Sequence, residues 1–379
     1  MPSGFASYDD ISYKNKNGES DPSGSLSPFT FLCISLALLL FGFLLLYSAS
    51  YGKAIAEGYG HYHYFVRQVI AAIVAVISGY VVCRIPFHVI LKGWYVLLPV
   101  SLLTAFASLI PGFSENGHIV IDDLVLVQPG LLCALTAVLL AADFIPDAEK
   151  PGVNGNISFL LSFLSVAVLM LTAALSSGLG YYVLTALITA SVLKAKKLPA
   201  WAIALFAAVS LAGAFLLHHV VRFSDMYPLL TSEQYAVCLQ AFHDGGTCGV
   251  GIGYGLYKLE ALVFPESYQI SAVLAEETGM MGFLFYLILC AVLTVLGVRT
   301  AGRAKRKSEV KLESFSMALT AFLVVPAVIC PLYALSVLPL PGLLLPFTGY
   351  SVPGEYLTVL VTCILFKLVH AEGRGQDAN

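Results

Sequence analysis

Long, almost uncharged apolar runs dominate this chain, and they restrict its fold more than any other feature. A helix that crosses the hydrocarbon of a bilayer needs about 20 mostly apolar residues, and ten segments approach or exceed that length. Only 11% of the residues are charged and 58% are hydrophobic, whereas soluble domains carry about 25% charged residues. The sequence therefore predicts an all-α fold, a polytopic membrane bundle of about ten transmembrane helices.

The ten predicted spans follow one another with short polar segments between most of them. They are Pro28 to Tyr47, Tyr64 to Val82, Lys92 to Ile110, Pro129 to Ile145, Ile157 to Leu175, Gly178 to Leu193, Pro199 to His218, Ile270 to Val298, Ser314 to Val337 and Gly354 to His370. The one long interruption lies between the seventh and eighth spans.

Basic residues orient the bundle, because Lys and Arg are retained on the cytoplasmic side of a membrane. Loops that lead from odd to even spans hold only Lys53, Arg67, Arg222 and Lys258 of the twenty basic residues. The other sixteen lie in the remaining loops and in the two terminal segments. We therefore expect both termini to be cytoplasmic, and the large loop of about residues 219–269 to lie outside.

The two ends of the chain differ from its middle in composition. Residues 1–26 are polar, rich in Ser and Gly, and without apolar periodicity, which predicts a disordered cytoplasmic tail. The apolar run that follows is too long for a cleaved signal and its leading segment is acidic, so we expect a retained helix. Residues 27–371 form the predicted membrane domain, and residues 372–379 a second cytoplasmic tail.

Glycine is dense in the outer loop between Gly245 and Gly255. A nucleotide-binding loop needs a strand before it and a helix after it, and nucleotides are not available outside the cell. Two interpretations stay open for Gly245, Gly246, Gly249 and Gly251. Their backbone N–H groups could bind a pyrophosphate or line a sugar-binding groove, or the loop could need small residues to pack tightly against helices.

Acidic residues inside an apolar span are costly and are usually functional or paired. Glu276 and Glu277 fall about two turns into the eighth span if it starts at Ile270, and we take both as candidate catalytic residues. Adjacent helical positions point about 100° apart, so one of them at most can face a given cavity. Alternatively, the helix starts later and both residues cap it at the interface.

Three further residues carry charge on the expected outer side. Glu266 is the first candidate for a catalytic base, although an exposed loop glutamate can equally be a solvated surface group. Lys258 and Arg67 are candidates for binding pyrophosphate, and the alternative for Lys258 is that it reaches to lipid phosphates.

Cysteines and histidines indicate no metal site, because paired Cys or His ligand spacings are absent. A divalent metal is possible but not indicated, and we expect no other cofactor. Cys238 and Cys248 share the outer loop, where a disulfide is possible in an oxidising compartment. The basic run from Arg299 to Lys311 fits the inner membrane surface, so we expect no nucleic-acid partner.

Six segments, in order along the chain, together resemble one family of membrane proteins. They are Leu44 to Ser50 (LLLYSAS), Tyr64 to Gln68 with Arg84-Ile85-Pro86, Gly245 to Gly253, Lys258-Leu259 with Pro265-Glu266, Ala272 to Gly279, and Pro339 to Phe347 with Tyr350. This pattern is similar to the FtsW/RodA family of shape, elongation, division and sporulation proteins, of which the chain resembles a divergent member.

The resemblance implies ten spans with both termini inside, and a site at the outer membrane face. Its best-studied members polymerise a lipid-linked disaccharide into peptidoglycan glycan strands, usually with a partner transpeptidase. It thus implies a bacterial cytoplasmic-membrane protein of division or elongation, with a lipid-linked precursor, membrane lipids and a class B transpeptidase as partners.

Several chemical positions of the family pattern are altered here. An Asp is expected a few residues after the Pro-Glu, but Pro265-Glu266 is followed by Ser267-Tyr268-Gln269-Ile270. The Glu and Lys expected after Gln128-Pro129 are missing, as is the Gln-Pro-Asp expected before the sixth span.

Two functions of different classes follow. The first is an active glycosyltransferase in which Glu266, Glu276 or Glu277 replaces the missing Asp as the base that takes the acceptor's proton. The second is a catalytically degenerate scaffold that holds a transpeptidase or division protein. A lipid-precursor transporter is less favoured, since the spans carry few buried charges outside the eighth.

Overall fold

The protein is described here from a computed structural model that covers residues 28–110, 114–115, 118–121, 124–146, 155–220, 232–338, 340 and 342–377. The predicted tail of residues 1–26 lies outside these ranges, as do Arg222 and most of the segment just after the seventh span.

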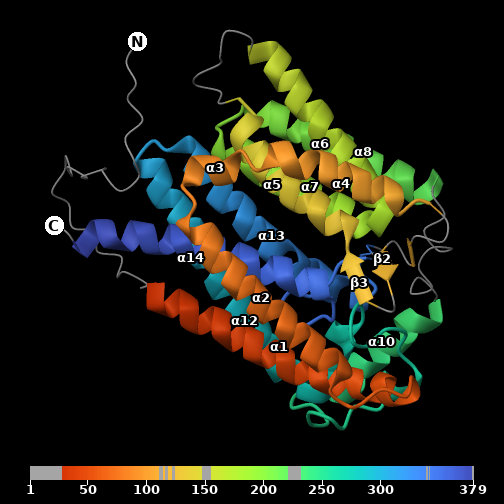
Figure 1. The fold of residues 1–379 in the computed structure, drawn as a ribbon. Coiled ribbons are helices and arrows are strands. Elements are labelled where there is room, and N and C mark those ends of the chain that lie inside the picture. Colours follow the sequence, from red (N-terminus) through yellow and green to blue (C-terminus); the bar gives the residue numbers. More distant parts are fainter. Residues whose placement is uncertain are drawn as a thin grey trace.

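Helices account for all ten predicted spans, which confirms the all-α membrane bundle (Figure 1). They are α1 (Pro28–Ala56), α2 (His63–Arg84), α3 (Phe87–Leu91), α4 (Trp94–Ala107), α5 (Pro129–Phe144), α6 (Gly155–Ser177), α7 (Leu179–Ala195), α8 (Ala200–Val220), α12 (Ile270–Arg306), α13 (Val310–Ala334) and α14 (Val352–Asp377). Within the described residues, eight helical segments are long and apolar enough to cross a membrane, with α3 and α4 counted as one. The shorter apolar helices α5 and α7 complete the ten.

Short elements fill the segments between spans. A three-stranded antiparallel sheet of β1 (Ser114–Glu115), β2 (His118–Ile121) and β3 (Leu124–Val127) joins α4 to α5, and the sequence had not indicated it. The outer loop contains α10 (Ser232–Gly245) and the single turn α11 (Tyr257–Glu260).

The bundle has two groups of helices with α13 between them. One group contains α4, α5, α6, α7 and α8, and the other contains α1, α2, α12 and α14. Helix α13 packs against α5 and α7 on one side and against α12 on the other. Helix α8 packs mainly on α7, and only 6% of its apolar stretch is buried.

The start of α1 and the end of α14 lie at the same end of the bundle, as an even number of crossings requires (Figure 1). Also at that end, Asp143 of α5 pairs with Lys311 of α13 at 2.7 Å and accepts a hydrogen bond from the Trp94 indole at 3.1 Å. Assignment of this end to the cytoplasm stays a prediction.

A non-helical segment runs from α13 to α14 beside α1. Gly42 of α1 lies against it so closely that a Cβ atom there would sit 1.7 Å from the Phe347 carbonyl oxygen. Non-helical backbone is tolerated at membrane depth only where protein covers it, and α1 provides this cover.

Gly42→Ala should therefore separate α1 from this segment and lower the thermal unfolding temperature in detergent. Gly302→Ala is the matched control, because Gly302 also lies within a helix and a Cβ there meets nothing within 4 Å. This control should be neutral or stabilising by up to about 1 kcal/mol, since Ala favours helix over Gly. Equal unfolding temperatures for the two variants would contradict the close packing.

Candidate active site

Helix α12 is broken near its N-terminal end. Gly279 has φ 65° and ψ −169°, so the helix stops after Thr278 and restarts at Met280. The first segment does begin at Ile270, as the sequence predicted, and the later start that would place both acids at a helix N-terminus is not found. Glu276 and Glu277 instead end the first segment, and each is no more than 2% exposed.

The glycine-rich loop supplies the backbone hydrogen bonds that this break interrupts. The N–H groups of Val250 and Gly251 donate to the carbonyls of Glu276 and Glu277, each at 3.0 Å. In return, the Gly246 and Thr247 carbonyls accept from the first two N–H groups after the break, at 2.9 and 3.1 Å. The loop and the broken helix therefore form one hydrogen-bonded unit.

At two of the predicted glycine positions, Gly245 and Gly249, a side chain would clash with the backbone of α12. A Cβ atom on Gly245 would lie 2.1 Å from the Ala275 carbonyl oxygen, and one on Gly249 would lie 2.2 Å from the Glu277 carbonyl oxygen. Gly246 and Gly251 have positive φ, 53° and 103°, which other residues adopt at a cost. The packing interpretation thus has direct geometric support, while a substrate-binding role of these glycines stays a prediction.

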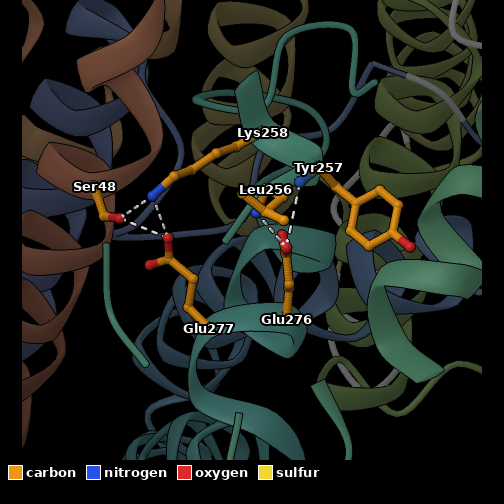
Figure 2. A network of polar contacts seen from close by, with 6 residues as sticks. All are labelled: Ser48, Leu256, Tyr257, Lys258, Glu276 and Glu277. Atoms are coloured by element: carbon orange, nitrogen blue, oxygen red, sulfur yellow. Dashed lines mark hydrogen bonds and ion pairs between the residues drawn. The ribbon is translucent and has the colours of Figure 1, made fainter. Parts of the chain in front are cut away.

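Lys258 and Glu277 form a buried ion pair that also includes Ser48 of α1 (Figure 2). Ser48 Oγ donates to Glu277 Oε1 at 2.7 Å, and Lys258 Nζ lies 2.7 Å from Ser48 Oγ. The Lys258 side chain is 4% exposed, so it does not reach to lipid phosphates. A buried pair of this kind is costly to break, because the remaining charge has no water.

The Glu276 side chain points away from the Lys258–Glu277 pair and accepts hydrogen bonds from backbone N–H groups (Figure 2). Its Oε1 accepts from the N–H groups of Leu256 and Tyr257, at 2.6 and 3.3 Å. These groups start the single turn α11, so Glu276 fixes the turn that carries Lys258. The two adjacent acids, on different faces of the helix, thereby hold the same short segment.

Glu266 forms a second pair, with Lys53 at the end of α1. Lys53 Nζ lies 2.7 Å from Glu266 Oε1, and the side chains are 28% and 2% exposed. The rings of Tyr64 and Phe264 lie 5.4 and 5.2 Å from the ammonium group. The sequence had suggested an exposed glutamate as the alternative, and burial excludes this in the present conformation.

Tyr350 connects Arg67 to this second pair by two hydrogen bonds. The Tyr350 N–H donates to the Glu266 carbonyl at 2.7 Å, and the Tyr350 hydroxyl is hydrogen-bonded to Arg67. Burial raises the pKa of Tyr350, and the Arg67 guanidinium only partly opposes this. Tyr350 is therefore a neutral phenol that can donate a hydrogen bond at neutral pH.

Arg67 lines an apolar groove of about 510 Å³. Its walls come from α2, from the start of α5 and from the start of α14, through residues such as Ile70, Val74, Leu132 and Leu357. Arg67 and Gln128 are its polar members. Ligand sites typically measure about 300–1,000 Å³ and are mostly apolar with a few polar groups, and this groove has that character.

A polar network behind the groove includes a buried acid that the sequence analysis missed. Gln68 donates to Glu355 Oε2 and to the Gly349 carbonyl, both at 3.2 Å, and accepts from the Ser351 N–H at 3.2 Å. Glu355 is 2% exposed and lies in the first turn of α14. The spans thus contain a buried ionisable side chain outside the eighth, although they were expected to hold almost none.

The structure therefore brings the predicted residues into two neighbouring clusters at one end of α1. Lys258, Glu276, Glu277 and the glycines form one, and Glu266 and Arg67 form the other. Lys53, Ser48 and Tyr350 had not been taken as site residues, although Ser48 and Tyr350 fell within quoted motifs. Cys238 is buried, Cys248 is exposed, and both are free thiols, so the disulfide considered above is absent.

One oxygen of each candidate catalytic acid has no hydrogen-bond partner. These buried atoms are Oε2 of Glu266, Glu276 and Glu277. Buried polar atoms are rarely left in this state, and each oxygen is an available proton acceptor. Chemically, the arrangement offers carboxylates, two lysines and an arginine next to an apolar groove.

Comparisons with known proteins match nearly the whole length of the chain. A family model named for FtsW, RodA and SpoVE, and described as "Cell cycle protein", matches residues 29–372. The "Probable peptidoglycan glycosyltransferase FtsW" of Marinobacter nauticus is 28% identical over 371 residues, covering 94% of this chain and 92% of the relative. The protein of the same name from Helicobacter pylori J99 is 28% identical, covering 89% and 96%.

Solved structures share the fold at lower identity. The rod shape determining protein RodA of Thermus thermophilus superposes with a TM-score of 0.64 at 19% identity, covering 93% of this chain and 99% of that one. A chain from a peptidoglycan synthase complex superposes with a TM-score of 0.61 at 20% identity, covering 91% and 98%. Because the family model spans nearly all described residues, this chain belongs to the FtsW/RodA/SpoVE family of membrane proteins.

Proposed function

We propose that this protein extends peptidoglycan glycan strands from a lipid-linked disaccharide at the outer face of the bacterial cytoplasmic membrane. Family membership supports this function, since the relatives reported above are named as peptidoglycan glycosyltransferases.

The observation that carries the proposal is the connection from groove to carboxylate. Arg67 lines the apolar groove and is hydrogen-bonded to Tyr350. The Tyr350 N–H binds the Glu266 carbonyl, and the Glu266 carboxylate pairs with Lys53. A polyprenyl tail fits an apolar groove open to lipid, and a pyrophosphate at its end needs cations and hydrogen-bond donors. Arg67, the Tyr350 hydroxyl and Lys53 supply both.

The reaction then needs one proton acceptor. The 4-hydroxyl of the acceptor sugar attacks the anomeric carbon of the donor, the bond to the pyrophosphate oxygen breaks, and a carboxylate takes the hydroxyl proton. Glu266 is the best placed for this step, because its Oε2 is unpartnered and its cluster adjoins the groove. Glu276 and Glu277 each use one oxygen to hold the α11 turn, which fits a positioning role.

A scaffold function is the second candidate, and one observation favours it. All three candidate acids are no more than 2% exposed, and the segment after Pro265-Glu266 offers only buried Tyr268 and Gln269 where the family pattern has an Asp. In this function the clusters stabilise the outer surface that a partner binds. We propose a transpeptidase as that partner, supported by the fold shared with a chain of a peptidoglycan synthase complex.

Glycan polymerisation from purified lipid-linked disaccharide tests the proposal, with the protein alone and co-purified with a transpeptidase. Glu266→Gln should lower the rate about 10²-fold or more, because a general base contributes about 10²–10⁴-fold. Glu233→Gln, which changes an exposed glutamate of α10, should leave the rate unchanged. Folded wild-type protein that binds its partner but makes no strands would instead establish the scaffold function.

Lys258→Met should strongly destabilise the protein, by about 3–5 kcal/mol, because Glu277 would remain charged and buried without its cation. The double variant Lys258→Met/Glu277→Met should recover much of this loss. Thermal unfolding in detergent measures both. Lys311→Met is the control, since Lys311 is 55% exposed in its pair with Asp143 and such pairs contribute about 0–1 kcal/mol.

The same double variant separates positioning from catalysis at Glu277. A stable double variant that still makes strands would show that Glu277 only positions the α11 turn. Recovered stability without any strands would show that the reaction needs this pair beyond its contribution to stability.

A further inference from the structure

Six aromatic and histidine rings gather where α1 ends and α2 begins. They form three nearly parallel stacks: Tyr47 on Tyr62 at 5.5 Å and 18°, Tyr51 on His61 at 5.1 Å and 19°, and Tyr59 on His63 at 4.1 Å and 7°. We call these six rings the α1–α2 platform. The function proposed above uses none of them.

The platform is accessible from outside the protein. Tyr51, Tyr59 and Tyr62 are 41%, 37% and 59% exposed, and His61 is exposed as well. In each stack, one face of each ring is covered by its partner ring. The stacking therefore fixes the direction in which the uncovered face or edge points. Exposed tyrosines without such stacking would keep several rotamers, whereas stacked ones are ordered before a ligand arrives.

Ring contacts through Tyr64 also connect the platform to the candidate site. His63 of the platform meets the Tyr64 ring edge-on at 5.2 Å, and Tyr64 meets Tyr350 in the same way at 4.9 Å. Lys53, which pairs with Glu266, lies on α1 between Tyr51 and the loop. A polymer that leaves the site at Tyr350 would therefore meet the platform next.

The chemistry of these rings suits a carbohydrate. The face of an aromatic ring is negative and its edge positive, so a ring face attracts the C–H groups on the flat side of a sugar. Phenol hydroxyl and imidazole N–H groups can bond sugar hydroxyls and acetamido groups. A polyanion is disfavoured, because the platform itself contains no Lys or Arg side chain.

Membrane lipid is the other candidate, since Tyr is common at membrane interfaces. The predicted apolar run ends at Tyr47, and α1 continues to Ala56. At 1.5 Å per residue, Tyr51 lies about 6 Å beyond the end of that run, and the loop with His61 follows the end of the helix. A soluble ligand therefore fits most of the platform better than acyl chains do.

We propose that the α1–α2 platform binds the glycan strand, a chain of β-linked N-acetylated sugars, as the strand grows. This inference deepens the proposed function and rests on it for the identity of the natural ligand. The platform would hold the product close to the site between successive additions, which favours long strands over short ones.

Direct binding of a soluble probe tests the platform without any polymerisation. The probe is the hexamer of β-1,4-linked N-acetylglucosamine, titrated into the full-length protein in detergent and followed by saturation-transfer NMR and calorimetry. Tyr51→Ala/Tyr62→Ala should weaken binding about tenfold, because it removes two of the exposed rings that the sugar would contact. Tyr51→Phe/Tyr62→Phe keeps the rings and should retain most of the affinity.

Tyr95→Ala provides the matched control. Tyr95 is 62% exposed and stacks on Trp94 at 3.9 Å, but lies at the opposite end of the bundle. This variant should bind the hexamer as wild type does. Thermal unfolding confirms that each variant is folded, and the single variants Tyr51→Ala and Tyr62→Ala replace the double Ala variant if the latter does not fold.

Strand length gives a second readout that separates this inference from the proposed function. In the polymerisation assay, Tyr51→Ala/Tyr62→Ala should shorten the strands with little change in the initial rate. No hexamer binding by the wild type, or equal binding by the Ala and wild-type proteins, would overturn the inference. Hexamer binding that requires the platform, from a protein that makes no strands, would support the inference while the proposed glycosyl transfer failed.

Discussion

The break in α12 at Gly279 is the constraint on which the half of the structure around the candidate site depends. A helix interrupted inside a bundle leaves N–H and C=O groups that water cannot reach, and each costs free energy if it stays unpaired. Here the glycine loop pairs them from both sides of the break. Because the loop must approach the helix backbone so closely, Gly245 and Gly249 cannot carry side chains.

Buried charges follow from the same break. It places Glu276 and Glu277 beside the loop, where one binds the start of α11 and the other pairs with Lys258. Each charge is compensated within the protein, which low dielectric demands. The Lys53–Glu266 pair repeats this arrangement nearer the groove, so the C-terminal part of α1 contacts both clusters through Ser48 and Lys53.

Features encoded in neighbouring residues could be predicted from the sequence, and long-range pairings could not. The spans follow from hydropathy, which each run of about 20 residues carries by itself. The Lys53–Glu266 and Gln68–Glu355 contacts join residues 213 and 287 positions apart, and nothing local shows which residue each of them meets. Glu355 was overlooked because it stands at the edge of its predicted span, where an acid is ordinarily solvated. The glycines were recognised as unusual, but their packing partner at Gly279 became visible only in three dimensions.

Packing constrains helix α8 much less than it constrains the helices around the α12 break. Since so little of its surface meets the rest of the protein, most of its side chains face lipid, which accepts any apolar shape. Evolution can therefore exchange Leu, Phe, Val and Trp along this helix almost freely, provided that the average hydropathy is kept. Sequence drift should concentrate there, while the helices around the α12 break change only in concert with the loop that covers it.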